Sequence, residues 1–329
     1  MTLPNKETIY PEYFPDGYNV INQPNRTDRI LERLDEKDVS YLYPKELFLS
    51  LKKEEQLYNV KYDAGHWNQN GKFYGQQQII HYLNGLFPET EELERHEFDV
   101  TQSLEPYLTN SKFRIDELVP QYDLINTDAV QDQGIFDQIV VTSPNNYYLR
   151  YQNETALERG APKVLIFGDS YLGRSEQFYI NHCGEVVMLH ATNMPNAEYY
   201  ISVFQPDIVI YEVVERALQC EWDDFKKEKR CYPLYAALNG ISIESIFMNA
   251  NLTALKMEAI GHEIVSYSGS LDEADASDIL ALKAVLNGKE YDPILDKDAL
   301  SYLFSFRSED IAAVSEISFF VLRETRGQE

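Results

Sequence analysis

Apolar runs and helical segments alternate between residues 164 and 212. The runs at 164–167, 186–189 and 208–212 each suit a buried strand, and helical segments at 175–183 and 197–204 separate them. Strands joined through a helix pair in parallel with right-handed crossovers, which place helices on the faces of the sheet. The sequence therefore predicts an α/β fold with a parallel sheet flanked by helices.

The first of these strands runs into a turn that presents a serine. Val164 to Phe167 stops at Gly168 and Asp169, and Ser170 follows directly. Open α/β sheets place their sites at the carboxyl ends of strands, so Ser170 is expected at such a site. A serine hydroxyl is a weak nucleophile and needs a base within hydrogen-bond reach, together with a group that orients the base. A Gly-Asp-Ser tripeptide alone also fits a plain turn.

A segment upstream supplies the two groups that Ser170 lacks. Asp63 and His66 lie three positions apart, so a tight turn eased by Gly65 can place carboxylate and imidazole on one side. Taken alone, His66 reads as an ordinary packing or surface histidine, and Trp67 reads as core. Taken together, Ser170, His66 and Asp63 form a candidate set of nucleophile, base and orienter.

These two segments resemble the SGNH-hydrolase superfamily, whose members carry a Gly-Asp-Ser block and an Asp-x-x-His block. Ordinary SGNH esterases place the Asp-x-x-His block near the C-terminus, whereas here it precedes the serine and is followed by Trp67. This order is similar to that of the alginate O-acetyltransferase type. The resemblance spans about residues 4 to 218, and its further matches are at 4–11, 68–71, 151–154 and 205–216.

The resemblance implies Ser170 as the nucleophile, His66 as the base and Asp63 as its orienter. It implies an O-acetyltransferase that needs neither cofactor nor metal. Ser170 would take an acetyl group supplied by a membrane-bound O-acyltransferase and pass it to a hydroxyl of an exopolysaccharide or cell-wall polymer. Two alternatives stay open: a carbohydrate acetyl esterase with the same triad, and a non-catalytic glycan-binding assembly subunit in which the three side chains form a polar network.

The chain departs from this type in spacing and in oxyanion donors. Relatives show Asp-x-His-Trp, whereas one more residue separates Asp63 from His66. No Gly-x-Asn block of the SGNH esterases supplies extra donors, so the backbone N–H groups of Ser170 and Tyr171 are the expected oxyanion donors. Asn193, in the loop after strand 186–189, is a candidate to supplement them, although a plain turn-shaping role also explains it.

Two further side chains are candidates to line the site. Trp67 follows the histidine directly. Arg216 follows the third strand and, with Glu212 and Glu215, matches the acidic-Arg ending of the family segment. Arg216 either forms a buried ion pair that holds the sheet edge or faces the site.

The charge balance argues against two classes of partner. The chain has 54 acidic and 29 basic residues, a formal net charge of −25. Phosphate recognition needs clustered Lys and Arg, so a nucleic acid and an anionic membrane surface are both unexpected partners. A polysaccharide meets no such objection.

Neither a membrane span nor a signal peptide is predicted from these residues. No apolar stretch approaches the ~18 residues of a membrane span, and the start has no signal-peptide hydrophobic region. The resemblance nevertheless implies an extracellular or cell-surface protein, anchored through a segment absent from this chain. The 3 cysteines are too few for a disulfide scaffold. Whether Cys220 and Cys231 are bridged stays open, and Cys183 is expected to be free.

Two domains are predicted. Residues 1–222 form the α/β domain, with 88–146 as a largely polar insertion of small strands in which no catalysis is expected. A connector at 223–241 leads to 242–329, where short alternating runs and the turn signal Asn287-Gly288 predict a small antiparallel β-sandwich. The alginate type includes members with a C-terminal carbohydrate-binding module, so the resemblance implies that role for this domain.

Overall fold

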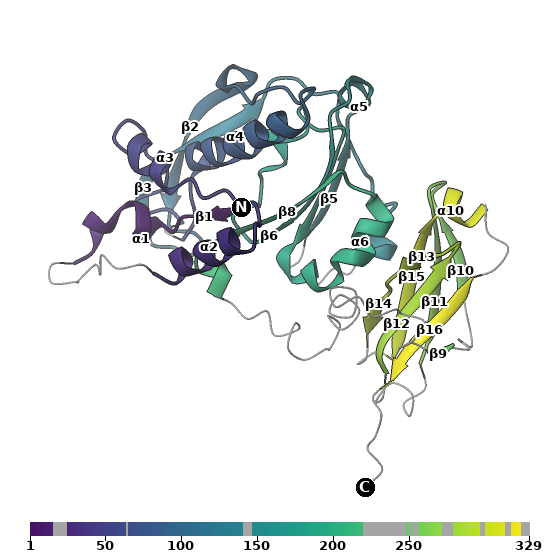
Figure 1. Ribbon diagram of the computed structural model, residues 1–329. Coiled ribbons are helices and arrows are strands. Elements are labelled where there is room, and N and C mark those ends of the chain that lie inside the picture. Colours follow the sequence, from purple (N-terminus) through teal and green to yellow (C-terminus); the bar gives the residue numbers. More distant parts are fainter. Residues whose placement is uncertain are drawn as a thin grey trace, which may run out of the picture. The chain divides into compact units, whose positions relative to one another are not determined.

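The computed structural model divides into two compact units (Figure 1). The first unit is Met1–Gln131, Leu149–Ala191 and Asp207–Cys220, and the second is Asp132–Tyr148, Thr192–Pro206 and Glu221–Glu329. The structure describes residues 1–15, 25–63, 65–140, 147–219, 248–249, 252, 256–271, 279–296, 300–312 and 317–323. The predicted connector at 223–241 and the Cys220–Cys231 pair lie outside the described residues. The predicted domain boundaries therefore stay predictions.

A six-stranded sheet in the order β1-β8-β6-β7-β5-β4 forms the centre of the first unit. Its strands are β1 (Thr2–Leu3), β4 (Val130–Gln131), β5 (Tyr148–Gln152), β6 (Lys163–Gly168), β7 (Glu185–His190) and β8 (Ile208–Val214). β6 pairs in parallel with both β7 and β8, and β1 pairs in parallel with β8, whereas β4 and β5 are antiparallel. The three strands predicted from the apolar runs are confirmed, in a sheet that is mixed rather than purely parallel.

Helices of the first unit are α1 (Lys6–Ile9), α2 (Arg26–Glu36), α3 (Lys45–Leu51), α4 (Gln69–Leu86) and α5 (Glu154–Arg159), with short 3₁₀ turns at Pro11–Tyr13, Arg95–Glu97, Glu176–Phe178 and Ala217–Gln219. The helix predicted at 175–183 is wrong, since only the 3₁₀ turn Glu176–Phe178 is present there. Phe178, Tyr179 and Ile180 are all buried. Such a run leaves no solvent face for an amphipathic helix.

Helix α4 packs closely on Trp67 because it carries a glycine at the contact. Asn68 caps the helix by accepting a hydrogen bond from the Gly71 N–H at 3.0 Å. A Cβ added at Gly75 would lie 2.4 Å from a ring carbon of Trp67, whereas one added at Gly85 would meet nothing within 4 Å. The indole ring therefore occupies the space that a side chain at Gly75 would need.

This packing predicts opposite effects for two matched substitutions in α4. Gly85→Ala is expected to stabilise the protein by up to about 1 kcal/mol, since alanine favours a helix over glycine. Gly75→Ala is expected to destabilise it by about 2 kcal/mol, because the overpacking against Trp67 outweighs the same helix gain. Urea denaturation of both variants measures the difference. Equal free energies of unfolding in the two variants would contradict the packing described.

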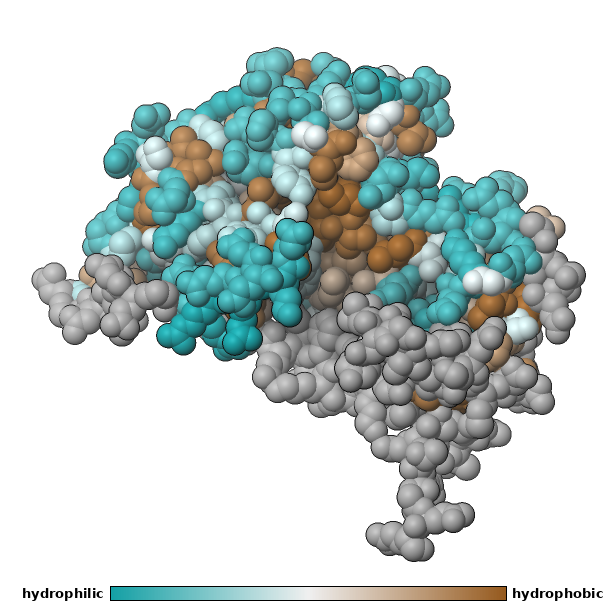
Figure 2. Space-filling model, in the orientation of Figure 1, coloured by the Kyte–Doolittle hydropathy of each residue, from teal (hydrophilic) through white to brown (hydrophobic). Residues whose placement is uncertain are grey.

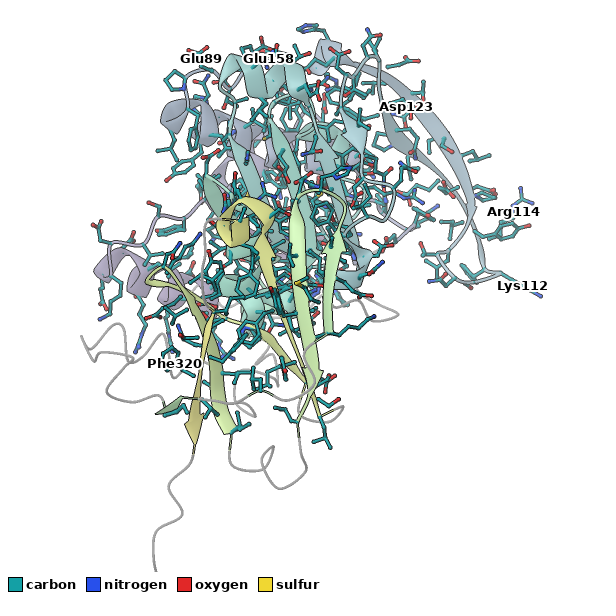
Figure 3. The ribbon with its side chains drawn as sticks, turned by 90° about the vertical axis from the view of Figure 1, so that its right-hand side faces the viewer. Glu89, Lys112, Arg114, Asp123, Glu158 and Phe320 are labelled. Carbon is teal, nitrogen blue, oxygen red and sulfur yellow. The ribbon has the colours of Figure 1, made fainter. Side chains whose placement is uncertain are left out.

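A long antiparallel hairpin lies beside α4 (Figure 1). It consists of β2 (Phe98–Tyr107) and β3 (Arg114–Leu124). The rings of Phe73 and Tyr122 stack with centroids 5.5 Å apart and fix the hairpin to the helix. Figure 3 shows Lys112 and Arg114 at its far end. The predicted insertion at 88–146 thus contains two strands of 10 and 11 residues.

The second unit holds two four-stranded antiparallel sheets, β10-β11-β15-β14 and β13-β12-β16-β9. The strands are β9 (Met248–Asn249), β10 (Lys256–Ile260), β11 (Ile264–Ser270), β12 (Ile279–Leu286), β13 (Lys289–Tyr291), β14 (Ile294–Asp296), β15 (Ser301–Arg307) and β16 (Ser318–Arg323). Helices α6 (Ala197–Phe204) and α10 (Ser308–Ala312) and the 3₁₀ turn Asp137–Ile139 belong to this unit. A further 3₁₀ turn, Ala191–Asn196, precedes α6.

The two sheets contribute to one buried cluster. Leu282 and Leu286 of β12 share it with Phe304 and Phe306 of β15. Asn287 and Gly288 join β12 to β13 with φ of 48° and 80°, which confirms the predicted hairpin turn. A β-sandwich requires such a shared core, and the sandwich itself stays a prediction.

Apolar side chains also reach the surface near the central sheet, where Figure 2 shows a hydrophobic strip. In the first unit a cleft of about 360 Å³ is lined by partly exposed residues of β8, such as Val209, and by apolar residues of two helices, Leu34 of α2 and Ile79 of α4.

Among the described residues, no helix is both long enough and apolar enough to traverse a bilayer.

Candidate active site

Ser170 lies in a turn that β8 holds in place. The buried Asp169 carboxylate accepts hydrogen bonds from the N–H groups of Tyr171 at 2.8 Å and Val214 at 2.9 Å, and the Asp169 N–H donates to the Glu212 carbonyl at 3.2 Å. Burial raises the pKa of Asp169, while these backbone N–H groups act to lower it. Ser170 itself is exposed. The turn thus presents the serine on a fixed backbone.

The structure brings Ser170, His66 and Asp63 together. His66 Nε2 lies 2.8 Å from Ser170 Oγ, and His66 Nδ1 lies 2.8 Å from Asp63 Oδ1. Because a carboxylate only accepts, this arrangement assigns the Nδ1 proton to the Asp63 bond and leaves Nε2 to accept from the serine hydroxyl. The hydrogen bond from His66 lowers the pKa of Asp63, against the effect of burial. The three side chains have the geometry of a nucleophile, a base and an orienter.

Asp63 adopts a backbone conformation that a non-glycine residue rarely takes. Its φ is 41°, in the left-handed region. Strained positions of this kind persist only where the surrounding structure determines them. The three residues before it, Val60 to Tyr62, supply that constraint through a side chain on the hairpin.

The carboxylate of Glu117, on β3, supplies this constraint. Glu117 was not among the residues predicted from the sequence to belong to the site. Its carboxylate accepts hydrogen bonds from three successive backbone N–H groups, those of Val60 at 2.6 Å, Lys61 at 2.7 Å and Tyr62 at 2.5 Å. Burial acts to raise the pKa of Glu117, but the three N–H groups lower it below its ordinary value. No local pattern marks Glu117, because its partners lie more than 50 positions upstream in the chain.

Tyr171 and Arg216 both donate hydrogen bonds to the carbonyl of Gly65, which precedes His66. The Tyr171 hydroxyl donates to the Gly65 carbonyl at 2.7 Å, and its ring centroid lies 5.2 Å from that of His66. Arg216 Nη2 donates to the same carbonyl at 3.2 Å, and its guanidinium carbon lies 5.0 Å from the centre of the Tyr171 ring. Burial raises the pKa of Tyr171 to about 12, so its hydroxyl stays protonated as a donor.

Both predicted roles of Arg216 need correction. Among the described residues it forms no ion pair with Glu212 or Glu215, whose carboxylates accept hydrogen bonds from Gln76 and Tyr179, and from Asn5, Thr8 and Tyr43, respectively. Arg216 is also not among the residues that line the cleft at Ser170, and its guanidinium lies over the Tyr171 ring. Arg216 is a positioning residue for the Gly65 turn.

Trp67 is largely core, with one part at the site. It is 3% exposed, and its indole N–H donates to the Tyr171 carbonyl at 2.9 Å. It also lines the cleft, as predicted from its place after His66. The indole thereby connects the histidine segment to the turn that holds the serine.

The oxyanion donors differ from the prediction. The Tyr171 N–H already donates to Asp169, so of the two predicted backbone donors only the Ser170 N–H has no acceptor among the described residues. Asn193 belongs to the second unit, where its Oδ1 accepts from the Tyr200 hydroxyl at 3.0 Å. Its role as a supplementary donor stays a prediction.

An open cleft of about 390 Å³ lies in front of Ser170. It is lined by the histidine segment, the start of α4, the hairpin and the serine turn; these residues include Asn59, Gln69, Lys72, Glu105, Gln121 and Arg174. Burial lowers the pKa of Lys72 to about 8, and its ammonium donates to the Gly173 carbonyl. Among the described residues, no group of three or more His, Cys, Asp or Glu side chains is arranged to hold a metal ion.

Comparison with known proteins gives a likeness of fold. No protein-family model matches the chain, and no curated protein sequence matches it significantly. A structure of Bacillus cereus PatB1 with a sulfonyl adduct is similar, with a TM-score of 0.50 and 16% sequence identity over 69% of this chain and 84% of that one. At this identity the comparison shows that the two proteins share an α/β fold.

Two further solved structures have lower TM-scores. One is a DHHW family protein from Eubacterium siraeum, with a TM-score of 0.46 and 16% identity over 65% of this chain and 76% of that one. The other is the O-acetyltransferase domain of Pseudomonas putida AlgJ, with a TM-score of 0.43 and 12% identity over 72% of this chain and 80% of that one.

Proposed function

We propose that this protein is an O-acetyltransferase that moves an acetyl group through a Ser170 acyl-enzyme onto hydroxyl groups of a polysaccharide. The observation that carries the proposal is the hydrogen-bonded series Ser170, His66 and Asp63 at the wall of an open cleft. The order of the Asp-x-x-His-Trp and Gly-Asp-Ser blocks, which resembles the alginate O-acetyltransferase type, supports acetyl transfer over other acyl chemistry.

In the first half-reaction, Ser170 Oγ attacks the carbonyl carbon of the acetyl donor while His66 Nε2 takes the hydroxyl proton. The Ser170 N–H donates to the oxygen of the tetrahedral intermediate, and Asp63 stabilises the imidazolium. As the intermediate collapses, the bond to the leaving group breaks and His66 returns the proton to that group. The acetyl group is then esterified to Ser170.

In the second half-reaction, a sugar hydroxyl enters the cleft and gives its proton to His66 as its oxygen attacks the acetyl-serine carbonyl. The ester bond to Ser170 breaks, and His66 returns the proton to Oγ. The cleft of about 390 Å³ has room for a sugar unit beside Ser170.

The remaining parts of the proposal rest on the resemblance. A membrane-bound O-acyltransferase supplies the acetyl group, the reaction takes place outside the cell or at its surface, and the C-terminal sheets act as a carbohydrate-binding module. A plain acetyl esterase is the second candidate, since its triad would be the same and water would replace the sugar hydroxyl.

Product analysis separates transfer from hydrolysis. The protein is incubated with p-nitrophenyl acetate and an oligosaccharide, and acetylated sugar and free acetate are measured. We expect acetylated oligosaccharide from the wild type and none from Ser170→Ala. Acetate as the sole product would favour the esterase. Product formation that is unchanged in Ser170→Ala would contradict both candidates.

A further inference from the structure

A second cavity adjoins the Ser170 cleft. It has a volume of about 530 Å³ and is formed by Tyr62 and the end of the hairpin; its other lining residues are Tyr107, Leu108, Thr109, Asn110, Ser111 and Lys112. Tyr62 lines both cavities. The two cavities therefore share a lining residue, and we name the second one the hairpin groove.

The chemistry of the hairpin groove suits a sugar chain. Tyr62 and Tyr107 offer aromatic rings, and Tyr107 is 51% exposed. Thr109, Asn110 and Ser111 place hydroxyl and amide groups beside them. A pyranose has an apolar face that packs on an aromatic ring and a rim of hydroxyls that need hydrogen-bond partners.

The charge of the groove is also unusual for this chain. Although the protein carries 54 acidic residues, no acidic residue lines the groove among the described residues, and Lys112 is its one charged lining residue. Neither a neutral nor an acidic sugar chain would therefore meet a carboxylate there.

Both walls of the groove are held in place. Within the turn at the hairpin end, the Leu108 N–H donates to the Phe113 carbonyl at 2.9 Å, and the Phe113 N–H donates to Ser111 Oγ at 3.0 Å. Tyr62 is fixed through its own N–H by Glu117. A groove with fixed walls loses little conformational freedom on binding.

We propose that the hairpin groove binds the polysaccharide acceptor strand, with a sugar ring stacked on Tyr107 and the chain continuing past Tyr62 to the sugar that is acetylated at Ser170. This inference rests on the proposed function, because it takes the acceptor to be a polymer of sugars. It assigns to the β2–β3 hairpin the role of acceptor recognition.

Binding of two hexasaccharides tests the inference. One is the neutral hexamer of N-acetylglucosamine and the other is an acidic hexamer of a uronic acid, each titrated by calorimetry into the full chain. We expect the wild type to bind at least one of them, and the one bound identifies the charge class of the acceptor. Tyr107→Ala should weaken that binding by about tenfold, as expected when a central aromatic contact is truncated. Tyr107→Phe keeps the ring and should bind like the wild type.

Phe113→Ala is the matched control. Phe113 lies on the same hairpin and is 69% exposed, but it does not line the groove. We expect it to bind like the wild type. Failure of the wild type to bind either hexamer, unchanged binding by Tyr107→Ala, or an equal loss in Phe113→Ala would overturn the inference. Acetylation of Ser170 by p-nitrophenyl acetate, measured in the same variants, reports on the proposed function separately because that small donor needs no groove.

Discussion

Replacing Ser170 by alanine is expected to lower the turnover of p-nitrophenyl acetate by on the order of 10³-fold or more. The reason is that the attacking oxygen is removed while the cleft remains. His66→Ala is expected to show a loss of similar size, because Ser170 Oγ then has no base at 2.8 Å. Since the two residues act as a unit, the double variant should be no slower than either single variant.

His81→Ala serves as the histidine control. The His81 side chain is 72% exposed and pairs with Glu92, and it does not line the cleft. Its variant should retain wild-type turnover. Initial rates across a range of substrate concentrations, corrected for spontaneous hydrolysis, provide the measurement. Wild-type kcat in Ser170→Ala would remove this serine from the mechanism.

Glu117→Gln is expected to destabilise the protein by about 3 kcal/mol, although Glu117 touches no reacting atom. An amide offers one oxygen, and its NH₂ group would face backbone N–H donors, so buried donors of Val60, Lys61 or Tyr62 lose their acceptor. The released segment leads directly into Asp63. Turnover should therefore also fall, by about tenfold or more, because the orienter no longer fixes His66.

The pH dependence of stability separates this role from a general loss of packing. The pKa of Glu117 is lowered in the folded state, so its contribution is present above the unfolded value of 4.5 and is lost as pH falls through the folded pKa. The difference in unfolding free energy between wild type and Glu117→Gln should thus shrink as the solution is acidified below about pH 4.5. Urea denaturation at pH 7 and at acidic pH measures it.

Glu105→Gln provides the matched control for stability. Glu105 lies on the same hairpin, and its carboxylate accepts no hydrogen bond from the described part of the chain. Its stability at pH 7 should equal that of the wild type. A Glu117→Gln variant as stable as Glu105→Gln would show that the carboxylate does not anchor the histidine segment.

The features that sequence alone predicts well are those encoded locally. An unbroken apolar run predicts the strand Lys163–Gly168, and the turn that carries Ser170 follows it directly. Asp63 and His66 are only three positions apart, so their contact needs one turn of chain. The resemblance adds the pairing of that turn with Ser170, which lies 104 positions away.

The features that could not be predicted from the sequence depend either on contacts between distant residues or on which acceptor one N–H group binds. The role of the hairpin follows from Glu117 and from the stacking of Tyr122 on Phe73, and neither partner is near in sequence. The Tyr171 N–H was expected to hold the oxyanion. Asp169, the aspartate of the Gly-Asp-Ser block, accepts a hydrogen bond from that N–H instead. Only the side-chain geometry shows this contact.

Mass spectrometry of the intact protein after incubation with p-nitrophenyl acetate tests the central claim most directly. We predict one acetyl adduct on the wild type, mapped to Ser170 by peptide analysis and lost in both Ser170→Ala and His66→Ala. An adduct that persists in Ser170→Ala, or the absence of any adduct while p-nitrophenol is released at the uncatalysed rate, would contradict an activated serine at this site.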